Sequence, residues 1–176
     1  EEIPPYVLDL ALKQGATDVV VGLVEEDKRV IRFSNNEVSV SKAYHEVMLN
    51  IFLMIEKHRA ATTAPVSSAK NLEKIVLRLM KTARMTPPAE IYAPLPKGPF
   101  HYDQKLLKGS RISLEPNELM GYVEEAIASA LEEGAKKVAG TLVATKAKMT
   151  LATSGEVHVT EKQAGLEMSV RAFTSD

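Results

Sequence analysis

The stretch ALKQGATDVVVGLV (residues 11–24) recurs as ALEEGAKKVAGTLV (residues 130–143), and this recurrence decides the fold. A shift of 119 residues aligns both copies and, without a gap, also aligns SNNEVSVS (34–41) with TSGEVHVT (153–160). About ten positions between 11 and 54 are identical to their shifted partners, where average residue usage gives roughly two or three. A duplicated α+β unit is therefore predicted.

Each repeat begins with a helix that ends at a glycine. In the second repeat the apolar residues recur at helical spacing, and Gly134 stands where a left-handed residue ends a helix. Gly15 has the same place in the first repeat. The predicted stripes are Val7, Leu8, Ala11 and Leu12, and Leu119, Val123, Ala126, Ile127, Ala130 and Leu131. A strand is expected after each helix, from Thr17 and from Lys136.

Two strands joined to each other by a short turn are expected next in each repeat. Asn35-Asn36 and Ser154-Gly155 are the turn residues that tolerate a positive φ. The segments 37–41 and 156–160 alternate with period two, which predicts short strands with Val38, Val40, Val157 and Val159 facing a core. Separate closing strands are expected at 46–55 and 165–173. The resulting fold is α+β, with helices packed on antiparallel β-meanders.

More chain lies between the repeats. HRAATTAP (58–65) predicts a strand, and Ser67 or Ser68 can cap a helix with the stripe Leu72, Ile75, Val76, Leu79, Met80 and Ala83. We expect that helix to pack on its own sheet; a partner-binding helix is the alternative. The proline-rich connector that follows is expected to be extended, pinned by Tyr92, Phe100 and Tyr102, or else to be a ligand for another domain.

Composition limits the function classes. The 176 residues include 22 Lys plus Arg against 23 Asp plus Glu, so the net charge of -1 gives no broad field for nucleic acid or anionic lipid. The chain contains no Cys, which excludes disulfides and thiolate metal sites within it. No apolar run reaches the ~20 residues of a membrane span, and EEIPPYVLDL lacks the basic start of a signal peptide. A cytoplasmic protein is expected.

A search for chemistry nominates no catalytic, cofactor-binding or metal-binding residue. KAYHEVMLN (42–50) begins like a zinc peptidase motif at His45-Glu46, but Leu49 and Asn50 stand where the second His is needed. A strand is the better interpretation. His58, expected in a hairpin turn, His101 in the connector and His158 are too scattered to give ligand spacing on one element. A site assembled from distant positions is the alternative.

The order of these segments resembles the N-terminal half of the TldD/PmbA family. The resemblance rests on residues 15–65, with IRFSNN (31–36) and AATT (60–63), then a Ser-capped helix ending in KTAR (81–84). FHYDQK (100–105) and LATSGEVHVTEKQAGLEMSVRAF (151–173) extend it over essentially the whole chain.

The resemblance implies a cytoplasmic zinc peptidase system, first described as a modulator of DNA gyrase, that degrades unstructured peptides. Its catalytic member carries H-E-x-x-x-H and a Cys ligand after the region matched here, and a paralogous partner lacks the motif. Zinc is therefore expected only in a C-terminal half outside residues 1–176. Since His45-Glu46 meets Asn50 where the second His belongs, no catalytic residue is transferred and the segment alone is predicted to be inactive.

Residues 1–176 are accordingly expected to form the N-terminal domain of a longer chain, since MSVRAFTSD stops at a strand exit. The predicted division is a first half-repeat with an extra helix (1–85), a connector (86–112) and a second half-repeat (113–176). Expected partners are the chain's own C-terminal domain, a second copy or a paralogous subunit, and an unstructured peptide held along an edge strand. The alternative is a stand-alone protein-binding module of gyrase-modulator type that performs no chemistry.

Overall fold

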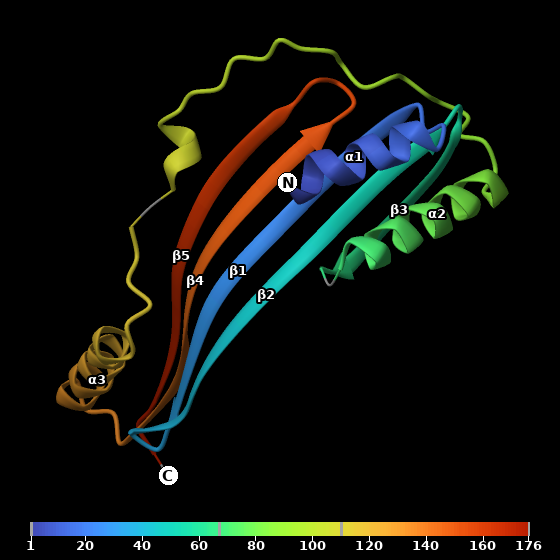
Figure 1. Cartoon of the computed structure of the whole chain (residues 1–176). Helices are drawn as coiled ribbons and strands as arrows, with labels where there is room; N and C mark the ends of the chain where they lie inside the picture. Colours follow the sequence, from blue (N-terminus) through green and yellow to red (C-terminus); the bar gives the residue numbers. More distant parts are fainter. Residues whose placement is uncertain (1, 67, 110, 176) are drawn as a thin grey trace. The chain divides into compact units, whose positions relative to one another are not determined.

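The computed structural model describes residues 2–66, 68–109 and 111–175 (Figure 1). It is an α+β fold in which three helices pack on an antiparallel sheet, as the sequence predicts. The elements in chain order are α1 (Ile3–Lys13), β1 (Asp18–Ser34), β2 (Glu37–Ile55), β3 (His58–Pro65), α2 (Ala69–Met85), the short 3-10 helix η1 (Leu106–Lys108), α3 (Pro116–Glu132), β4 (Lys137–Thr153) and β5 (His158–Phe173). None of the helices in these described ranges is long and apolar enough to cross a membrane.

The sheet has the strand order β3-β2-β1-β4-β5, so β1 is its middle strand and β4 lies next to β1. These two strands are repeat equivalents, because Asp18–Ser34 moved by 119 positions gives Lys137–Thr153. The expected glycines also lie where the helices end, Gly15 with φ 94° and Gly134 with φ 95°. Within α1 and α3 the predicted stripes hold except at their last members: Leu12 and Leu131 are 38% and 39% exposed. Leu12 and Leu131 come directly after Ala11 and Ala130, which face inward. One residue turns an α-helix by about 100°, so the two leucine side chains point away from the core.

The prediction of separate short strands is wrong for β2 and β5. Residues 37–41 and 46–55 belong to one continuous strand, Glu37–Ile55, and residues 165–173 are the end of His158–Phe173. The intervening residues 41–46 are all exposed and separate the two predicted strands, although KAYHEVMLN (42–50) itself favours a strand, which the structure confirms. Ladder hydrogen bonds join backbone groups, however, so a strand continues through a polar stretch that contains no Gly or Pro. Of the four expected core valines, only Val38 packs against a core cluster, and Val40, Val157 and Val159 are half-buried.

The first turn matches its prediction and the second does not. Asn35 and Asn36 have φ values of 51° and 66°, whereas in the β4–β5 turn the positive φ of 66° belongs to Glu156 and not to Gly155. Gly155 is needed for space, because a Cβ there would overlap the backbone oxygen of Pro96. The Gly98 N–H also donates to the Gly155 oxygen at 3.0 Å. The connector therefore passes directly against this turn.

Each turn caps the first strand of the other repeat. The Val138 N–H donates to Asn36 Oδ1 at 2.7 Å, and the Val19 N–H donates to Ser154 Oγ at 3.0 Å. Val19 and Val138 are equivalent positions in the two repeats. The turn side chains thus accept hydrogen bonds from backbone N–H groups near the starts of β1 and β4. These bonds help to set the register in which the β1 strand of the first repeat lies against the β4 strand of the second.

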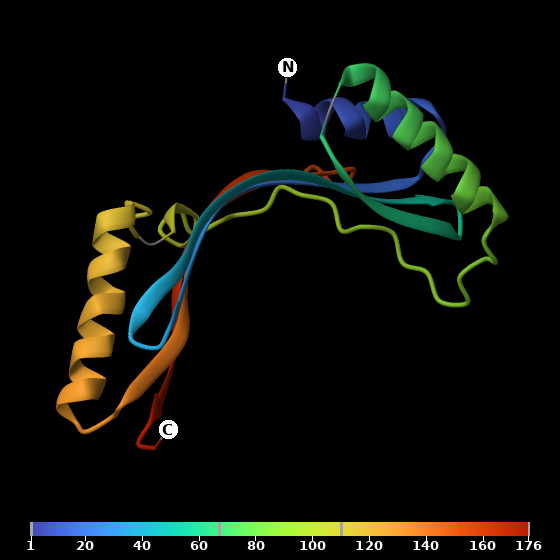
Figure 2. The ribbon, with the colours of Figure 1, turned by 90° about the horizontal axis from the view of Figure 1, so that it is seen from below.

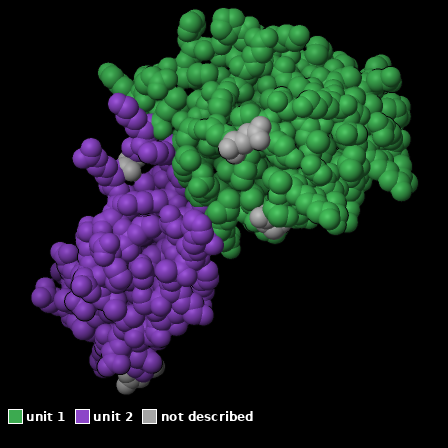
Figure 3. All heavy atoms as spheres, in the orientation of Figure 1, with its two compact units in different colours: residues 1–25, 46–107, 148–161 green, residues 26–45, 108–147, 162–176 purple. Residues whose placement is uncertain are grey.

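Two compact units, coloured separately in Figure 3, each draw on both repeats. Unit 1 comprises residues 1–25, 46–107 and 148–161, and unit 2 comprises 26–45, 108–147 and 162–176. In unit 1, α1 and α2 lie on the same side of the sheet (Figure 2) over Val19, Val21, Ile51 and Leu53. In unit 2, α3 covers Ile31, Phe33, Val138 and Leu142. The boundaries 1–85, 86–112 and 113–176 describe the sequence repeat and stay a prediction.

Helix α2 and strand β3 form as predicted. The Asn71 N–H donates to the side chain of Ser68, which is the N-cap; the alternative cap, Ser67, lies outside the described residues. The stripe faces inward, with Ile75 partly buried and Leu72, Val76, Leu79, Met80 and Ala83 buried. The helix therefore uses its apolar face for its own core.

The connector is held by a buried carboxylate that the sequence analysis missed. Asp18, at the start of β1 and 6% exposed, accepts hydrogen bonds from the Tyr92 hydroxyl and, at 2.9 Å, from the Leu95 N–H. The prediction that aromatic residues pin the connector thus holds for Tyr92. Phe100 and Tyr102 are 37% and 40% exposed, and for them it stays a prediction. The hydrogen bond to Asp18, helped by partial removal from water and by the carboxylate charge, raises the pKa of Tyr92.

This raised pKa predicts a specific alkaline sensitivity. The folded state favours the protonated phenol, so its contribution is present below the unfolded pKa of about 10 and is lost as the pH rises through the higher folded pKa. We expect Tyr92→Phe to be less stable than the native chain at pH 8, and the difference to shrink at strongly alkaline pH. Urea unfolding of both proteins across that range measures it, and a difference that stays constant contradicts the prediction.

Candidate functional site

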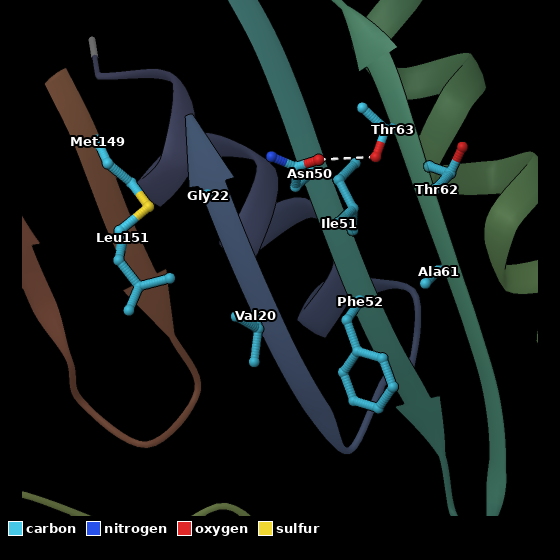
Figure 4. Close-up of a pocket in the computed structure, with 10 residues that line it drawn as sticks. All are labelled: Val20, Gly22, Asn50, Ile51, Phe52, Ala61, Thr62, Thr63, Met149 and Leu151. Carbon is cyan, nitrogen blue, oxygen red and sulfur yellow. Dashed lines mark hydrogen bonds between the residues drawn. The ribbon is translucent and has the colours of Figure 1, made fainter. Parts of the chain in front are cut away.

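A hollow of about 530 Å³ lies within unit 1, on the face of the sheet away from α1 and α2 (Figure 4). Four strands contribute to it, and β3 is at the edge of the sheet. The lining residues are Val20, Gly22, Asn50, Ile51, Phe52, Ala61, Thr62, Thr63, Met149 and Leu151. This volume is similar to that of small-molecule pockets, about 300–1,000 Å³, but the hollow is open along the face of the sheet.

The hollow exists because the strands of unit 1 are apolar on both faces. Val19 and Val21 point to the helices, so Val20 between them points to the open face; Phe52 is placed in the same way between Ile51 and Leu53. Gly22 removes a side chain from the middle of the floor, and a Cβ built there has only Asn50 Cβ nearby, at 3.9 Å. The sequence signal was present in VVVGLV and NIFLMI, which are apolar at consecutive positions and not only at alternate ones.

The rim of the hollow toward β3 is polar but uncharged. The Thr63 hydroxyl donates to Asn50 Oδ1 at 2.7 Å across the β2–β3 pair (Figure 4). These two residues are direct partners in the antiparallel register, as are Phe52 and Ala61. None of the ten lining residues is ionisable. The surface therefore suits an apolar ligand that makes a few hydrogen bonds.

At alternate residues of β3, beside this hollow, the backbone N–H and C=O groups point away from β2 and toward the free edge of the sheet. The Val66 N–H donates to the Val47 oxygen, which identifies residues 58, 60, 62, 64 and 66 as the ones that bond to β2. The N–H and C=O groups of Ala61 and Thr63 therefore point away from the sheet, and both residues are exposed. At either end the edge is closed, because the Thr86 hydroxyl donates to the Arg59 oxygen and Pro65 has no N–H.

An exposed strand edge of this kind can add one more strand. Paired N–H and C=O groups give the affinity in such complexes, and pockets for alternate side chains give the specificity. In unit 1 the edge groups of Ala61 and Thr63 and the apolar hollow lie side by side. The arrangement can hold a short extended peptide.

The four histidines lie on separate elements, and three of them have structural partners. His45 lies within β2 and pairs with Asp27 at 2.8 Å, and His158 begins β5 and pairs with Glu2 at 2.9 Å. His58 is the first residue of β3, one position beyond the turn where it was expected, and its Nδ1–H donates to the Thr86 oxygen at 2.6 Å. His101 is exposed in the connector. Among residues 2–66, 68–109 and 111–175, no group of three or more His, Asp or Glu could hold a metal ion, so these residues do not fit a zinc site.

No family model matches the sequence, and no curated protein matches it either. Solved structures do share its fold. A candidate modulator of DNA gyrase from Bacteroides thetaiotaomicron superposes with a TM-score of 0.77 at 17% identity, over 95% of this chain and 39% of that one. TldE from Thermococcus kodakarensis gives 0.74 at 13% identity, over 97% and 40%. A candidate modulator of a DNA gyrase from Thermotoga maritima gives 0.71 at 14%, over 93% and 37%.

The expected resemblance to the N-terminal domain of TldD/PmbA proteins is thus confirmed at the level of the fold. The chain spans about two fifths of the length of each of these proteins. At such identities the likeness concerns architecture, so activity has to be argued from the site itself.

Proposed function

We propose that this chain is the N-terminal, non-catalytic domain of a TldD/PmbA-type zinc metallopeptidase or of its inactive partner subunit, and that it holds unstructured peptides in extended form for proteolysis. The observation that carries the proposal is the free edge of β3 at Ala61 and Thr63, beside an uncharged apolar hollow. The fold likeness to TldE and to candidate gyrase modulators supports the family assignment.

In this proposal the described residues bind and the chemistry lies elsewhere. Zinc and its ligands are proposed to belong to a C-terminal half outside this sequence, as the resemblance to the TldD/PmbA family implies. The proposed partners are that C-terminal domain and a second subunit, either a copy of the same chain or a paralogue. A cytoplasmic location and the absence of nucleic-acid and membrane partners belong to the same proposal, and the near-neutral charge supports the latter.

Thr63→Pro tests the edge directly. Proline removes the outward N–H of Thr63 and leaves the β2 ladder intact, because Thr63 does not bond to β2 in this register. We expect the variant to bind an end-blocked, fluorescein-labelled Ser-Thr-Ser-Leu-Ser-Thr-Ser peptide roughly tenfold more weakly than the native chain in fluorescence anisotropy.

Thr63→Ala is the matched control, because it loses the hydrogen bond to Asn50 but keeps the backbone N–H. It should bind the peptide nearly as well as the native chain. Equal binding by the native chain and the proline variant would show that the β3 edge does not hold the peptide.

The identity of the parent chain is tested by the intact mass and downstream sequence of the native protein. An H-E-x-x-x-H motif and a later Cys beyond residue 176 make this the scaffold of an active peptidase, and a longer chain without them makes it the partner subunit. A natural stop at residue 176 would overturn the peptidase assignment in favour of a stand-alone binding module.

A further inference from the structure

We infer that the hollow beside β3 is a side-chain subsite that selects an extended peptide carrying one uncharged apolar side chain, with Phe52 as its main contact. The inference rests on the proposed edge binding and adds to it a substrate class. Backbone pairing at Ala61 and Thr63 would by itself accept any extended sequence, because the N–H and C=O groups are common to all residues.

The position of Ala61 gives an incoming side chain access to Phe52. Ala61 and Phe52 are direct cross-strand partners, so their side chains stand next to each other on the open face. A strand added to the β3 edge lies about 4.8 Å from β3. Its side chain opposite Ala61 meets only a methyl group there, and a long side chain can lean over that methyl group onto the half-buried Phe52 ring.

The chemistry of the lining excludes charged side chains. Beyond Phe52 the floor continues through Val20, Met149 and Leu151, all half-buried and all apolar. A carboxylate or an ammonium placed there would lose water and gain no partner of opposite charge, since no lining residue is ionisable. A leucine, methionine or phenylalanine side chain would exchange water for these apolar neighbours.

The test uses end-blocked, fluorescein-labelled peptides Ser-Thr-Ser-X-Ser-Thr-Ser with X as Leu, Phe, Ser or Glu, and fluorescence anisotropy with the full chain. We expect Leu and Phe to bind roughly tenfold more tightly than Ser, and Glu to bind no better than Ser. Ala61→Leu fills the access to Phe52 and keeps the edge N–H, so the Leu-to-Ser ratio should fall to about one while the Ser peptide still binds.

Phe52→Ala is a second variant, which removes the proposed contact with the Phe52 ring. Ala43→Leu is the matched control: it adds the same leucine at an exposed strand position in unit 2 and should keep the preference for the Leu peptide over the Ser peptide. Equal affinity of the native chain for the Leu and Ser peptides, both weakened by Thr63→Pro, would overturn the subsite and leave the edge proposal standing. Absence of binding for every X would overturn both. An undiminished Leu preference in both Ala61→Leu and Phe52→Ala would place the selecting pocket elsewhere.

Discussion

Replacing Gly140 with valine should destabilise the chain by about 3 kcal/mol, the upper end of the usual cost of overpacking. Valine is the residue that the repeat itself has at the equivalent position, Val21, where it is fully buried in the core under the helices of unit 1. At Gly140 the space that a valine side chain would need is already filled by atoms of other residues. An added Cβ would overlap both the backbone oxygen of Ser169 and the ring of Phe33.

Phe33 explains why the two repeats differ here. Its ring is 2% exposed and lies in the core of unit 2, over the space that Gly140 leaves free. The Ser169 oxygen belongs to the backbone of β5 and cannot rotate away, so relief requires movement of the strand itself. Gly140→Val combined with Phe33→Leu should therefore recover only part of the lost stability.

Gly165→Val is the matched control for this prediction. It also puts valine at a glycine of a strand in unit 2, but a Cβ there meets no other atom within 4 Å. Urea unfolding should find it within about 1 kcal/mol of the native chain, because valine suits a strand better than glycine does. A similar loss in both variants would mean that strand glycine as such, and not the space above Gly140, sets the stability.

Local signals were sufficient to predict the repeat, its helices and their glycine ends. Gly15 and Gly134 have nearly equal φ values because the same chain reversal follows each helix. The repeat has Val21 in one copy and Gly140 in the other, and the reason is the Phe33 ring, which fills the space above Gly140. Phe33 is distant from residue 140 in sequence, and no periodic pattern links the two positions. The continuity of β2 through residues 41–46 was missed for a related reason: side-chain polarity reports exposure, while the ladder is made by the backbone.

The candidate site could be predicted less well than the fold. An edge strand was expected to hold peptide, but which strand is at the edge follows from the order β3-β2-β1-β4-β5, and sequence pattern does not determine that order. The apolar residues Val20 and Phe52 were visible in the sequence, yet whether they meet a helix or open space depends on which face α1 and α2 cover. Asp18 was overlooked because an acidic residue at the start of a strand is usually solvated.

Asp18→Ala should cost about 3 kcal/mol of folding stability and release the connector. The buried carboxylate accepts hydrogen bonds from the Tyr92 hydroxyl and the Leu95 N–H, and bonds to a charged acceptor contribute about 1.5–3 kcal/mol each. Alanine leaves both donors without this acceptor. We expect a lower midpoint in urea and faster cleavage by protease within residues 86–105, identified by mass spectrometry of the fragments.

Asp27→Ala separates the loss of this contact from the loss of a negative charge. Asp27 also lies in β1, but its side chain is 60% exposed and its contact with His45 is at the surface, where even a charged pair contributes only about 0–1 kcal/mol. The two variants change the net charge equally, so any common effect comes from charge. Faster cleavage of the connector in Asp18→Ala alone would identify Asp18 as its anchor. Cleavage that stays at the native rate in Asp18→Ala would mean that the Gly155 contact with Pro96 and Gly98 holds the connector without it.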